Sequence, residues 1–227
     1  MSEHSRFGIY YLPPKGPIAE FGAQWLGWDI ELGHVCDRPY VAGIEDVTLA
    51  ARKYGFHGTL MPPFRLAEGA TREALEAAAD GIAKRHPPIR LSGLELSVIG
   101  GFLALTPIGD APALQGLAHD MVAELDRLRA APTPAELARR RAAGLTPSQE
   151  ANLLRWGYPY VMDEFRFHMT LTGKLTGARR LFAETAIRER LPELPRPFDM
   201  AEIALVGERT DGMFQTLHRY ALTGRSA

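Results

Sequence analysis

The stretch FHGTL at residues 56–60 returns as FHMTL at residues 167–171, so that His57 and His168 lie about half the chain apart. Around the second copy, residues 164–174, polar and apolar residues alternate. This alternation predicts a strand with one face in the core and the other exposed. On such a strand a histidine and the threonine two positions later point the same way, about 7 Å apart. Two such strands, side by side or across a cleft, would place two imidazoles and two hydroxyl groups around one small polar volume.

The composition is typical of an ordinary globular protein. Hydrophobic residues make up 46% of the chain and charged residues 23%, with a net charge of −1 and a pI of about 6.7. A chain so close to neutral has no bulk attraction for long nucleic acids or anionic membranes. The single cysteine, Cys36, excludes an intrachain disulfide and a multi-cysteine metal site. No long apolar run and no signal-peptide core are present, so we expect a cytoplasmic protein.

The expected elements follow the same order in the two halves of the chain. A first strand at 6–12 and helices at 18–30 and 44–53 come before the first motif. The first half then gives a histidine strand, a helix, a hairpin and a further helix, at residues 55–61, 71–86, 89–98 with 101–107, and 112–129. The second half gives a histidine strand, a helix and a hairpin, at residues 164–173, 176–191, and 198–206 with 213–222. Pro62 and Pro63 are expected to end the first histidine strand.

This repetition predicts an α+β protein formed by pseudo-symmetric duplication of a β-α-β-β unit. In such a bilobal fold, antiparallel sheets line a central cleft and the helices lie outside. We expect one bilobal domain over residues 1–227, with lobes at about 55–129 and 161–227, and the strand at 6–12 joining one of the sheets. Residues 130–160, where Pro, Ala and Arg are frequent, are expected to form a connector or a lid over the site.

The paired motifs resemble those of the two-histidine phosphoesterase superfamily, in which two His-x-Thr-Leu strands lie far apart in a bilobal chain. The segments RFGIYYLPP at 6–14, KYGFHGTLMPPFRL at 53–66 and FRFHMTLT at 165–172 are similar to a bacterial branch associated with phosphonate-metabolism operons. The resemblance covers nearly the whole chain. It implies an activity of the superfamily's kind, which includes cyclic nucleotide phosphodiesterases and enzymes acting on RNA 2′,3′-cyclic phosphates.

Phosphodiester hydrolysis gives an independent reason to expect these residue types. It needs a base for the attacking water and an acid for the leaving oxygen, and histidine, with a pKa of about 6.5, serves as either. We therefore assign His57 and His168 as the acid–base pair. The sequence does not indicate which of them is the acid and which the base. The hydroxyls of Thr59 and Thr170 would donate to the phosphate oxygens. This scheme needs no metal or other cofactor, and no His-x-x-x-His, His-Glu-x-x-His or Cys/His cluster indicates a zinc site.

Further residues are candidates for substrate binding, with ordinary surface or core packing as the alternative for each. Alternation places Arg166 and Lys174 on the face of His168, where they could contact a phosphate or remain solvated. Three more would line the mouth of the site or stack on a base or sugar: Arg52, Tyr54 and Tyr10. The run of arginines at 139–141 is expected to be a solvated helix face, unless its helix lies near the cleft and attracts an anionic substrate.

The leading hypothesis is a metal-independent phosphoesterase that hydrolyses a small phosphodiester, cyclic esters included. The resemblance adds a role in phosphonate metabolism, with cyclic ribose phosphates as candidate substrates. The main alternative is a non-catalytic module that binds a nucleotide or an RNA end in the same cleft. A ligase-like transfer between RNA ends is a third option, which the near-neutral charge disfavours. The sequence does not fix the oligomeric state.

Overall fold

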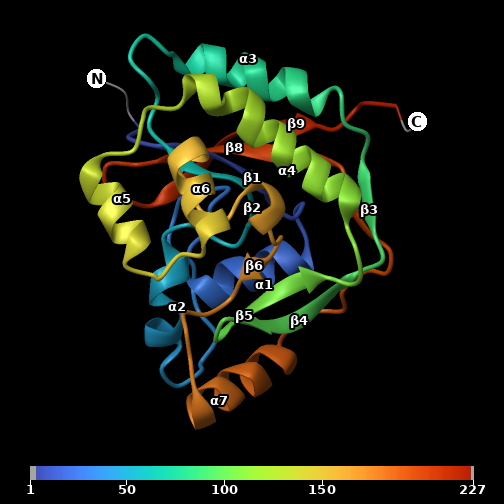
Figure 1. Cartoon of the computed structure of the whole chain (residues 1–227). Helices are drawn as coiled ribbons and strands as arrows, with labels where there is room; N and C mark the ends of the chain where they lie inside the picture. The colour runs from blue at the N-terminus through green and yellow to red at the C-terminus, as the bar shows by residue number, and fades with distance from the viewer. Residues whose placement is uncertain (1–3, 226–227) are drawn as a thin grey trace.

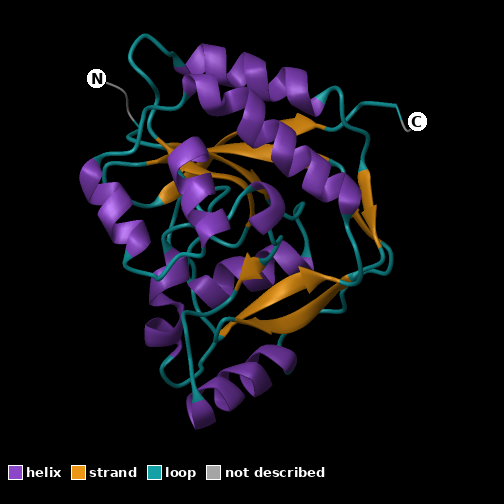
Figure 2. Cartoon of the chain, in the orientation of Figure 1, coloured by secondary structure: helices purple, strands orange, loops and turns teal. Residues whose placement is uncertain are grey.

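The computed structural model describes residues 4–225 and has a seven-stranded sheet at its centre (Figures 1 and 2). The strand order is β4-β5-β6-β2-β1-β8-β9, and each pair of neighbours is antiparallel. The elements up to the fourth helix are β1 (Phe7–Tyr11), α1 (Pro17–Leu26), α2 (Ile44–Arg52), β2 (Gly58–Phe64), α3 (Arg72–Ala83), β3 (Ile89–Leu91), β4 (Leu94–Ile99), β5 (Phe102–Pro107) and α4 (Pro112–Leu125). The remaining elements are two 3₁₀ turns, η1 (Asp126–Leu128) and η2 (Met162–Glu164), with α5 (Pro134–Arg141), α6 (Pro147–Trp156), β6 (Met169–Thr170), α7 (Gly177–Arg188), β7 (Phe198–Met200), β8 (Glu202–Glu208) and β9 (Phe214–Ala221).

The expected α+β fold and its internal duplication are confirmed. The unit β2-α3-β3-β4-β5 is repeated as β6-α7-β7-β8-β9. The two units exchange elements, because α3 packs on β8 and β9, α7 packs on β5, and β3 pairs with β7 in a separate two-stranded sheet. The histidine strands β2 and β6 are neighbours, so the sheets of the two halves are continuous.

Strand β1 breaks the symmetry of the duplication. In the first half β5 lies beside the histidine strand β6, with β4 outside it. In the second half β1 occupies the equivalent place beside β2, β8 lies outside it, and β9 becomes an additional edge strand. All five residues of β1 are buried. Its side chains therefore serve both faces of the sheet, with Ile9 in the main core and Tyr10 in a second cluster around Phe214.

Three strands differ from the expected bounds. Strand β2 continues through Pro62 and Pro63 to Phe64, so the expectation that the prolines end it is wrong. The pairing of β1 with β2 is irregular at this point, and such irregular pairing accommodates residues that lack an N–H donor. The strands expected at 89–98 and 198–206 are each divided in two, because β3 and β7 leave the main sheet to pair with each other.

The strand expected around the second histidine is also much shorter than the alternation indicated. Only Met169 and Thr170 form β6, and the 3₁₀ turn η2 precedes them. Alternation of polar and apolar residues therefore arises here in an irregular segment whose phenylalanines, Phe165 and Phe167, are buried.

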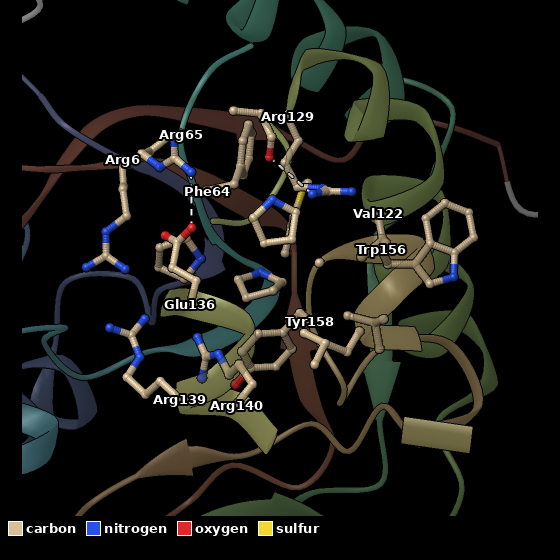
Figure 3. A pocket seen from close by; sticks show the side chains of 18 residues that line it. Arg6, Phe64, Arg65, Val122, Arg129, Glu136, Arg139, Arg140, Trp156 and Tyr158 are labelled. Atoms are coloured by element: carbon tan, nitrogen blue, oxygen red, sulfur yellow. Dashed lines mark hydrogen bonds and ion pairs between the residues drawn. The ribbon is translucent and has the colours of Figure 1, made fainter. Parts of the chain in front are cut away.

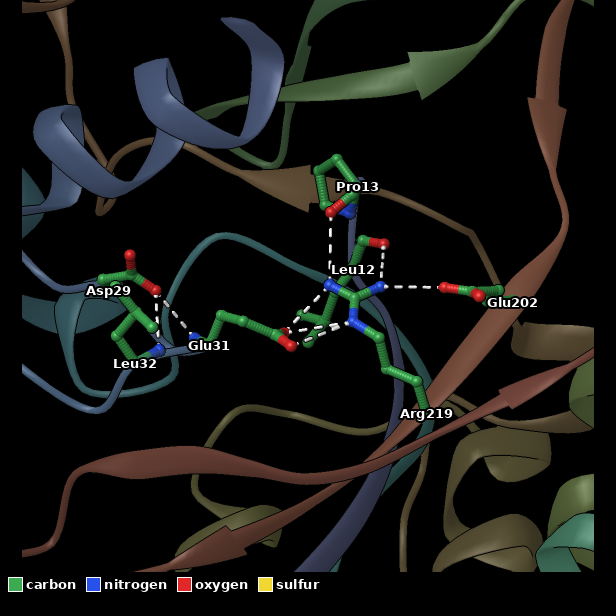
Figure 4. A network of polar contacts seen from close by, with 7 residues as sticks. All are labelled: Leu12, Pro13, Asp29, Glu31, Leu32, Glu202 and Arg219. Carbon is green, nitrogen blue, oxygen red and sulfur yellow. Dashed lines mark hydrogen bonds and ion pairs between the residues drawn. The ribbon is translucent and has the colours of Figure 1, made fainter. Parts of the chain in front are cut away.

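A network around Arg219 fixes the edge strand β9 to the N-terminal segment (Figure 4). The guanidinium group donates to the Glu31 carboxylate, at 2.9 Å from Nη2, and to the carbonyl oxygens of Leu12 and Pro13. A second carboxylate, that of Glu202, lies 3.5 Å from Nη1. This network closes the end of β1, where the chain leaves the sheet toward α1. Over the described part of the chain, no helix is both long enough and apolar enough to cross a membrane.

Candidate active site

The two histidine motifs meet at the centre of the sheet. Gly58 of β2 pairs with Met169 of β6 in antiparallel register. Continued by one residue in each direction, this register sets His57 opposite Thr170 and Thr59 opposite His168. The two histidines are then diagonal neighbours on one face of the sheet, a separation that large side chains can bridge. Each motif supplies one histidine and one threonine to an arrangement with local two-fold symmetry.

Hydrogen bonds at both ring nitrogens orient His57. Its Nδ1 lies 2.9 Å from the Gly55 carbonyl oxygen, and its Nε2 lies 2.9 Å from the Thr59 hydroxyl oxygen. Because a carbonyl only accepts, Nδ1 carries the proton, and Nε2 of the neutral ring accepts from the hydroxyl. Gly55 has φ 69°, and a Cβ there would stand 2.5 Å from Cβ of Ile30, so the turn that aims this carbonyl requires glycine.

His168 is oriented in the same way through its Nδ1. That nitrogen lies 2.7 Å from the Arg166 carbonyl oxygen and must donate to it. The Phe102 ring packs beside the imidazole, with ring centroids 5.4 Å apart. In both histidines, therefore, Nδ1 is fixed to the backbone two residues earlier, and Nε2 carries the lone pair. In His57 the Thr59 hydroxyl occupies this lone pair and has to turn away before the nitrogen can accept a proton from a ligand.

Aromatic packing covers one side of His57. The Tyr10 ring stacks on the imidazole, with centroids 3.8 Å apart and planes inclined by 19°. Tyr54 lies further out, with its ring centroid 6.2 Å from that of His57 and 5.2 Å from that of Phe214. The Tyr10 hydroxyl is buried and has no hydrogen-bond partner. Burial raises the Tyr10 pKa well above its ordinary value, so this phenol stays protonated.

Burial also sets the protonation of the histidines. Burial and, to a smaller extent, the nearby His168 lower the pKa of His57 to about 4, although its hydrogen bond to the Gly55 carbonyl raises it. Burial lowers the pKa of His168 as well, while its hydrogen bond to the Arg166 carbonyl raises it. The lowering of the pKa is larger for His57 than for His168, so the first proton taken up by the pair goes to His168.

A cavity of about 310 Å³ contains both histidines. This volume is within the range of sites for small molecules. Its walls come from α2, β5 and the two motifs, and the lining residues besides the histidines are Ala50, Ala51, Tyr54, Gly55, Phe102, Thr170, Thr172, Gly173 and Lys174.

The structure brings most of the expected site residues together. Tyr54, Thr170 and Lys174 line the cavity, and Thr59 and Tyr10 contact His57. Thr172, which the sequence analysis did not name, is buried beside them and binds backbone instead, accepting from the Leu103 amide and donating to the Gly173 carbonyl.

Two of the expected substrate-binding residues lie elsewhere. Arg166 lines a separate cavity, and its guanidinium group donates to the carbonyl oxygens of Asp163 and Phe165. The strand alternation that placed it beside His168 fails because the chain before Met169 is irregular. Arg52 is not part of the cavity wall, and its Nε is buried without a hydrogen-bond partner.

Sequence reasoning missed Tyr158, which lies in the segment expected to be a connector, and named Arg140 only within the arginine run at 139–141. Arg140 stacks over the Tyr158 ring, with Cζ 4.5 Å from the centroid. The phenol is close enough to Tyr54 and Tyr10 for the charge of one to shift the pKa of the others. Only the unusual arginine content of the segment marked it in the sequence. Residues 4–225 contain no group of three or more His, Cys, Asp or Glu side chains placed to bind a metal ion.

Comparison with models of known protein families assigns the chain to one family. A family model described as "Protein of unknown function (DUF1045)" matches residues 59–215, which is more than half of the sequence. The chain belongs to this family. The match begins at Thr59, within the first motif, and includes the whole of the second.

Two curated relatives of this DUF1045 chain are named ribose 1,5-bisphosphate phosphokinase PhnN. The protein from Janthinobacterium sp. (strain Marseille) is 39% identical over 180 residues, or 77% of this chain, and that from Laribacter hongkongensis (strain HLHK9) is 37% identical over 175 residues, or 75% of this chain. The chain spans about 40% of the length of each relative.

Solved phosphoesterase structures are similar to the DUF1045 chain over almost its whole length. E. coli LigT complexed with phosphate is 19% identical and covers 98% of this chain and 99% of its own, with a TM-score of 0.46. A structure described as a phosphoesterase is 18% identical and covers 96% of this chain and 99% of its own, with a TM-score of 0.44.

Proposed function

We propose that this chain is a phosphoesterase that hydrolyses a small cyclic phosphodiester through His57 and His168. The observation that carries the proposal is the register of β2 with β6, because it sets two histidines and two threonines on one face of the sheet. A cavity that contains both histidines is the natural place for the phosphorus atom. The substrate partner is a small molecule, since the site is a pocket and the chain carries no net positive charge.

The acid and base roles follow from the different surroundings of the two rings. Because the pKa of His57 is about 4, the ring is neutral near neutral pH and its Nε2 can take a proton from water. His168 binds the first proton of the pair, so it is the group that protonates the leaving oxygen. We therefore assign His57 as the general base and His168 as the general acid. Each role contributes about 10²–10⁴-fold to the rate.

The reaction is an in-line displacement. Water attacks phosphorus and loses a proton to Nε2 of His57, while the bond from phosphorus to the opposite ring oxygen breaks and that oxygen takes a proton from Nε2 of His168. The product is a phosphate monoester with a free hydroxyl group. When substrate binds, the Thr59 hydroxyl turns from Nε2 of His57 to a non-bridging oxygen, which frees that nitrogen to act as the base. The Thr170 hydroxyl donates to the non-bridging oxygens as well, where negative charge grows. The Lys174 ammonium group at the cavity wall adds a positive charge near the same oxygens.

The names of the curated relatives favour a ribose phosphate as substrate. They are named as kinases of ribose 1,5-bisphosphate, and this chain matches only part of their length. An activity that accompanies such a kinase in one polypeptide would produce or use a related sugar phosphate. Opening a cyclic phosphodiester of ribose produces one, and this supports the expected link to phosphonate metabolism.

An assay with cyclic and linear phosphodiesters in the presence of EDTA tests the proposal. We expect ring opening of a ribose cyclic phosphate to a monoester, followed by ³¹P NMR, and little action on linear diesters. The alternative, a binding module, predicts that ligand remains intact for hours with stoichiometric protein. Failure of every cyclic ester to react would exclude the proposed activity.

A further inference from the structure

A second cavity, lined by arginines, lies beside the histidine cavity. Its volume is about 50 Å³, room for a few water molecules or one phosphate-sized group. Its walls are β2 beyond the motif, the α5–α6 segment, and the start of β1 (Figure 3). Five arginines line it: Arg6, Arg65, Arg129, Arg139 and Arg140.

The carboxylates near this cavity do not balance its arginines. Glu136 is the acidic residue in the wall, and it pairs with Arg65 at 3.0 Å. Arg6 and Arg129 pair with carboxylates outside the wall, those of Glu208 and Asp126. Among residues 4–225, no carboxylate lies within ion-pair distance of Arg139 or Arg140. Two positive charges are therefore available to an anion, and Figure 3 shows them on the same side of the cavity as Arg6.

Tyrosines connect the arginine cavity with the histidine cavity. Tyr158 belongs to the arginine cavity and Tyr54 to the histidine cavity, and each affects the pKa of Tyr10. The Tyr10 ring stacks on His57, while Arg6 lowers the pKa of its hydroxyl. That hydroxyl is fully buried and has no hydrogen-bond partner. Ring contacts give the same connection: Cζ of Arg6, in the wall of the arginine cavity, lies 5.7 Å from the Phe214 centroid, and that centroid lies 5.2 Å from the ring centroid of Tyr54, in the wall of the histidine cavity.

Extending the proposed function, on which this inference rests, we propose that the arginine cavity binds a second phosphate group of the same substrate. The substrate is then a sugar with a cyclic phosphodiester at one end, held by the histidines, and a phosphate monoester at the other, held by Arg139 and Arg140. A monoester carries nearly two negative charges near neutral pH, and guanidinium groups bind such oxygens bidentately. The connector helices therefore act in substrate recognition, and the enzyme selects small phosphorylated sugars over unphosphorylated ones.

Binding of a simple sugar phosphate tests the arginine cavity without requiring turnover. The probe is ribose 5-phosphate, with ribose as its control, measured by calorimetry on the intact protein. The double variant Arg139→Gln/Arg140→Gln removes both free charges. Single substitutions Arg139→Gln, Arg140→Gln and Arg141→Gln are matched in charge; Arg141 is on the same helix but pairs with Glu150 away from the cavity. We leave Arg6 unchanged because its substitution would leave the Glu208 carboxylate without its ion-pair partner.

We expect ribose 5-phosphate to bind and ribose not to bind. Arg139→Gln and Arg140→Gln should each weaken binding by roughly tenfold, and the double variant by more, whereas Arg141→Gln should bind like the wild type. Equal binding of the phosphate by the double variant and the wild type would overturn the proposal, as would equal weakening by Arg141→Gln.

Turnover then separates this inference from the proposed function. A ribose cyclic phosphodiester is compared with the same ester carrying a 5-phosphate. We expect the double variant to lower kcat/KM for the phosphorylated ester by tenfold or more and to leave the other ester unchanged. Arginine-dependent binding with no turnover of either ester would overturn the hydrolase but support the phosphate site. Turnover of both esters at one rate, in wild type and double variant alike, would overturn the phosphate site and support the hydrolase.

Discussion

Gly58 and Met169 face each other across the two histidine strands, and the space above Gly58 is filled by the other motif. A Cβ on Gly58 would stand 2.3 Å from Cε2 of Phe167, too close for any real contact. The residue between the first histidine and its threonine is therefore glycine because the second motif packs against it. This contact fixes the two motifs relative to each other.

Gly58→Ala should consequently damage both stability and activity. Relieving the clash moves either the Phe167 ring or the strand, at a cost of roughly 1–3 kcal/mol in the free energy of unfolding. Denaturant unfolding measures the loss, and turnover of a cyclic ester measures the displacement of the histidines. A second substitution, Phe167→Leu, should recover part of the activity. A Gly58→Ala protein with wild-type stability and rate would show that the motifs are not packed as described.

Thr59→Val should slow the reaction while leaving the fold intact. The substitution keeps the side-chain shape but removes the hydroxyl, which donates to Nε2 of His57 in the structure and, in the proposed reaction, turns to a phosphate oxygen. Losing one such donor costs about 10²-fold in kcat. Thr59→Ser keeps the hydroxyl and should stay within a few fold of wild type. Equal rates for the valine and serine variants would remove Thr59 from the mechanism.

The pH dependence of kcat/KM should be bell-shaped with an acidic optimum. The free enzyme needs neutral His57, which holds above a pKa of about 4, and protonated His168, whose pKa is below the ordinary value of about 6.5. Activity should therefore already be falling as the pH rises through 6.5. An anionic substrate between the rings raises both pKa values, so the kcat profile should lie at higher pH. A kcat/KM that keeps rising to pH 9 would contradict the assignment.

Stability should fall as the pH decreases, in part because of His57. Its pKa is about 4 in the folded state and about 6.5 in the unfolded chain, so between these values the unfolded state binds more protons. Neutral His57 contributes roughly 1–3 kcal/mol to the free energy of unfolding. This contribution is fully present above about pH 6.5 and is lost as the pH falls toward 4. His57→Gln should therefore lose less stability between pH 7 and pH 5 than the wild type. His119→Gln, on α4 outside the histidine cavity, is the control; identical pH dependence in wild type and His57→Gln would count against a buried neutral imidazole.

Much of this architecture could be predicted from the sequence because the duplication is visible in it. The repeated motif and the expected order of strand, helix and hairpin can be read locally, and the elements they predict are present in the structure. The division of the hairpin strands at β3 and β7 depends on pairing between the two halves, which no local pattern records. The same holds for Arg166, whose place was inferred from an alternation that the irregular chain before β6 does not follow.

The arginine cavity shows a different limit of sequence reasoning. Arg139 and Arg140 are on a short helix that the sequence describes equally well as a solvated face. Their relation to the histidines comes from Tyr158 and from Arg6, which is more than 130 residues earlier in the chain. Contacts of this kind depend on how β1 and the α5–α6 segment reach one end of β2, and they follow only from the assembled sheet.

The central claim is that His57 and His168 act as a pair on one phosphorus atom. The measurement that tests it most directly is the single-turnover rate of cyclic ester opening for His57→Gln, His168→Gln and the double variant. Groups that act as a unit have strongly non-additive effects. We therefore predict that each single variant loses at least about 10²-fold and that the double variant loses little more. A wild-type rate in either single variant, or losses that multiply as for independent sites, would contradict the account.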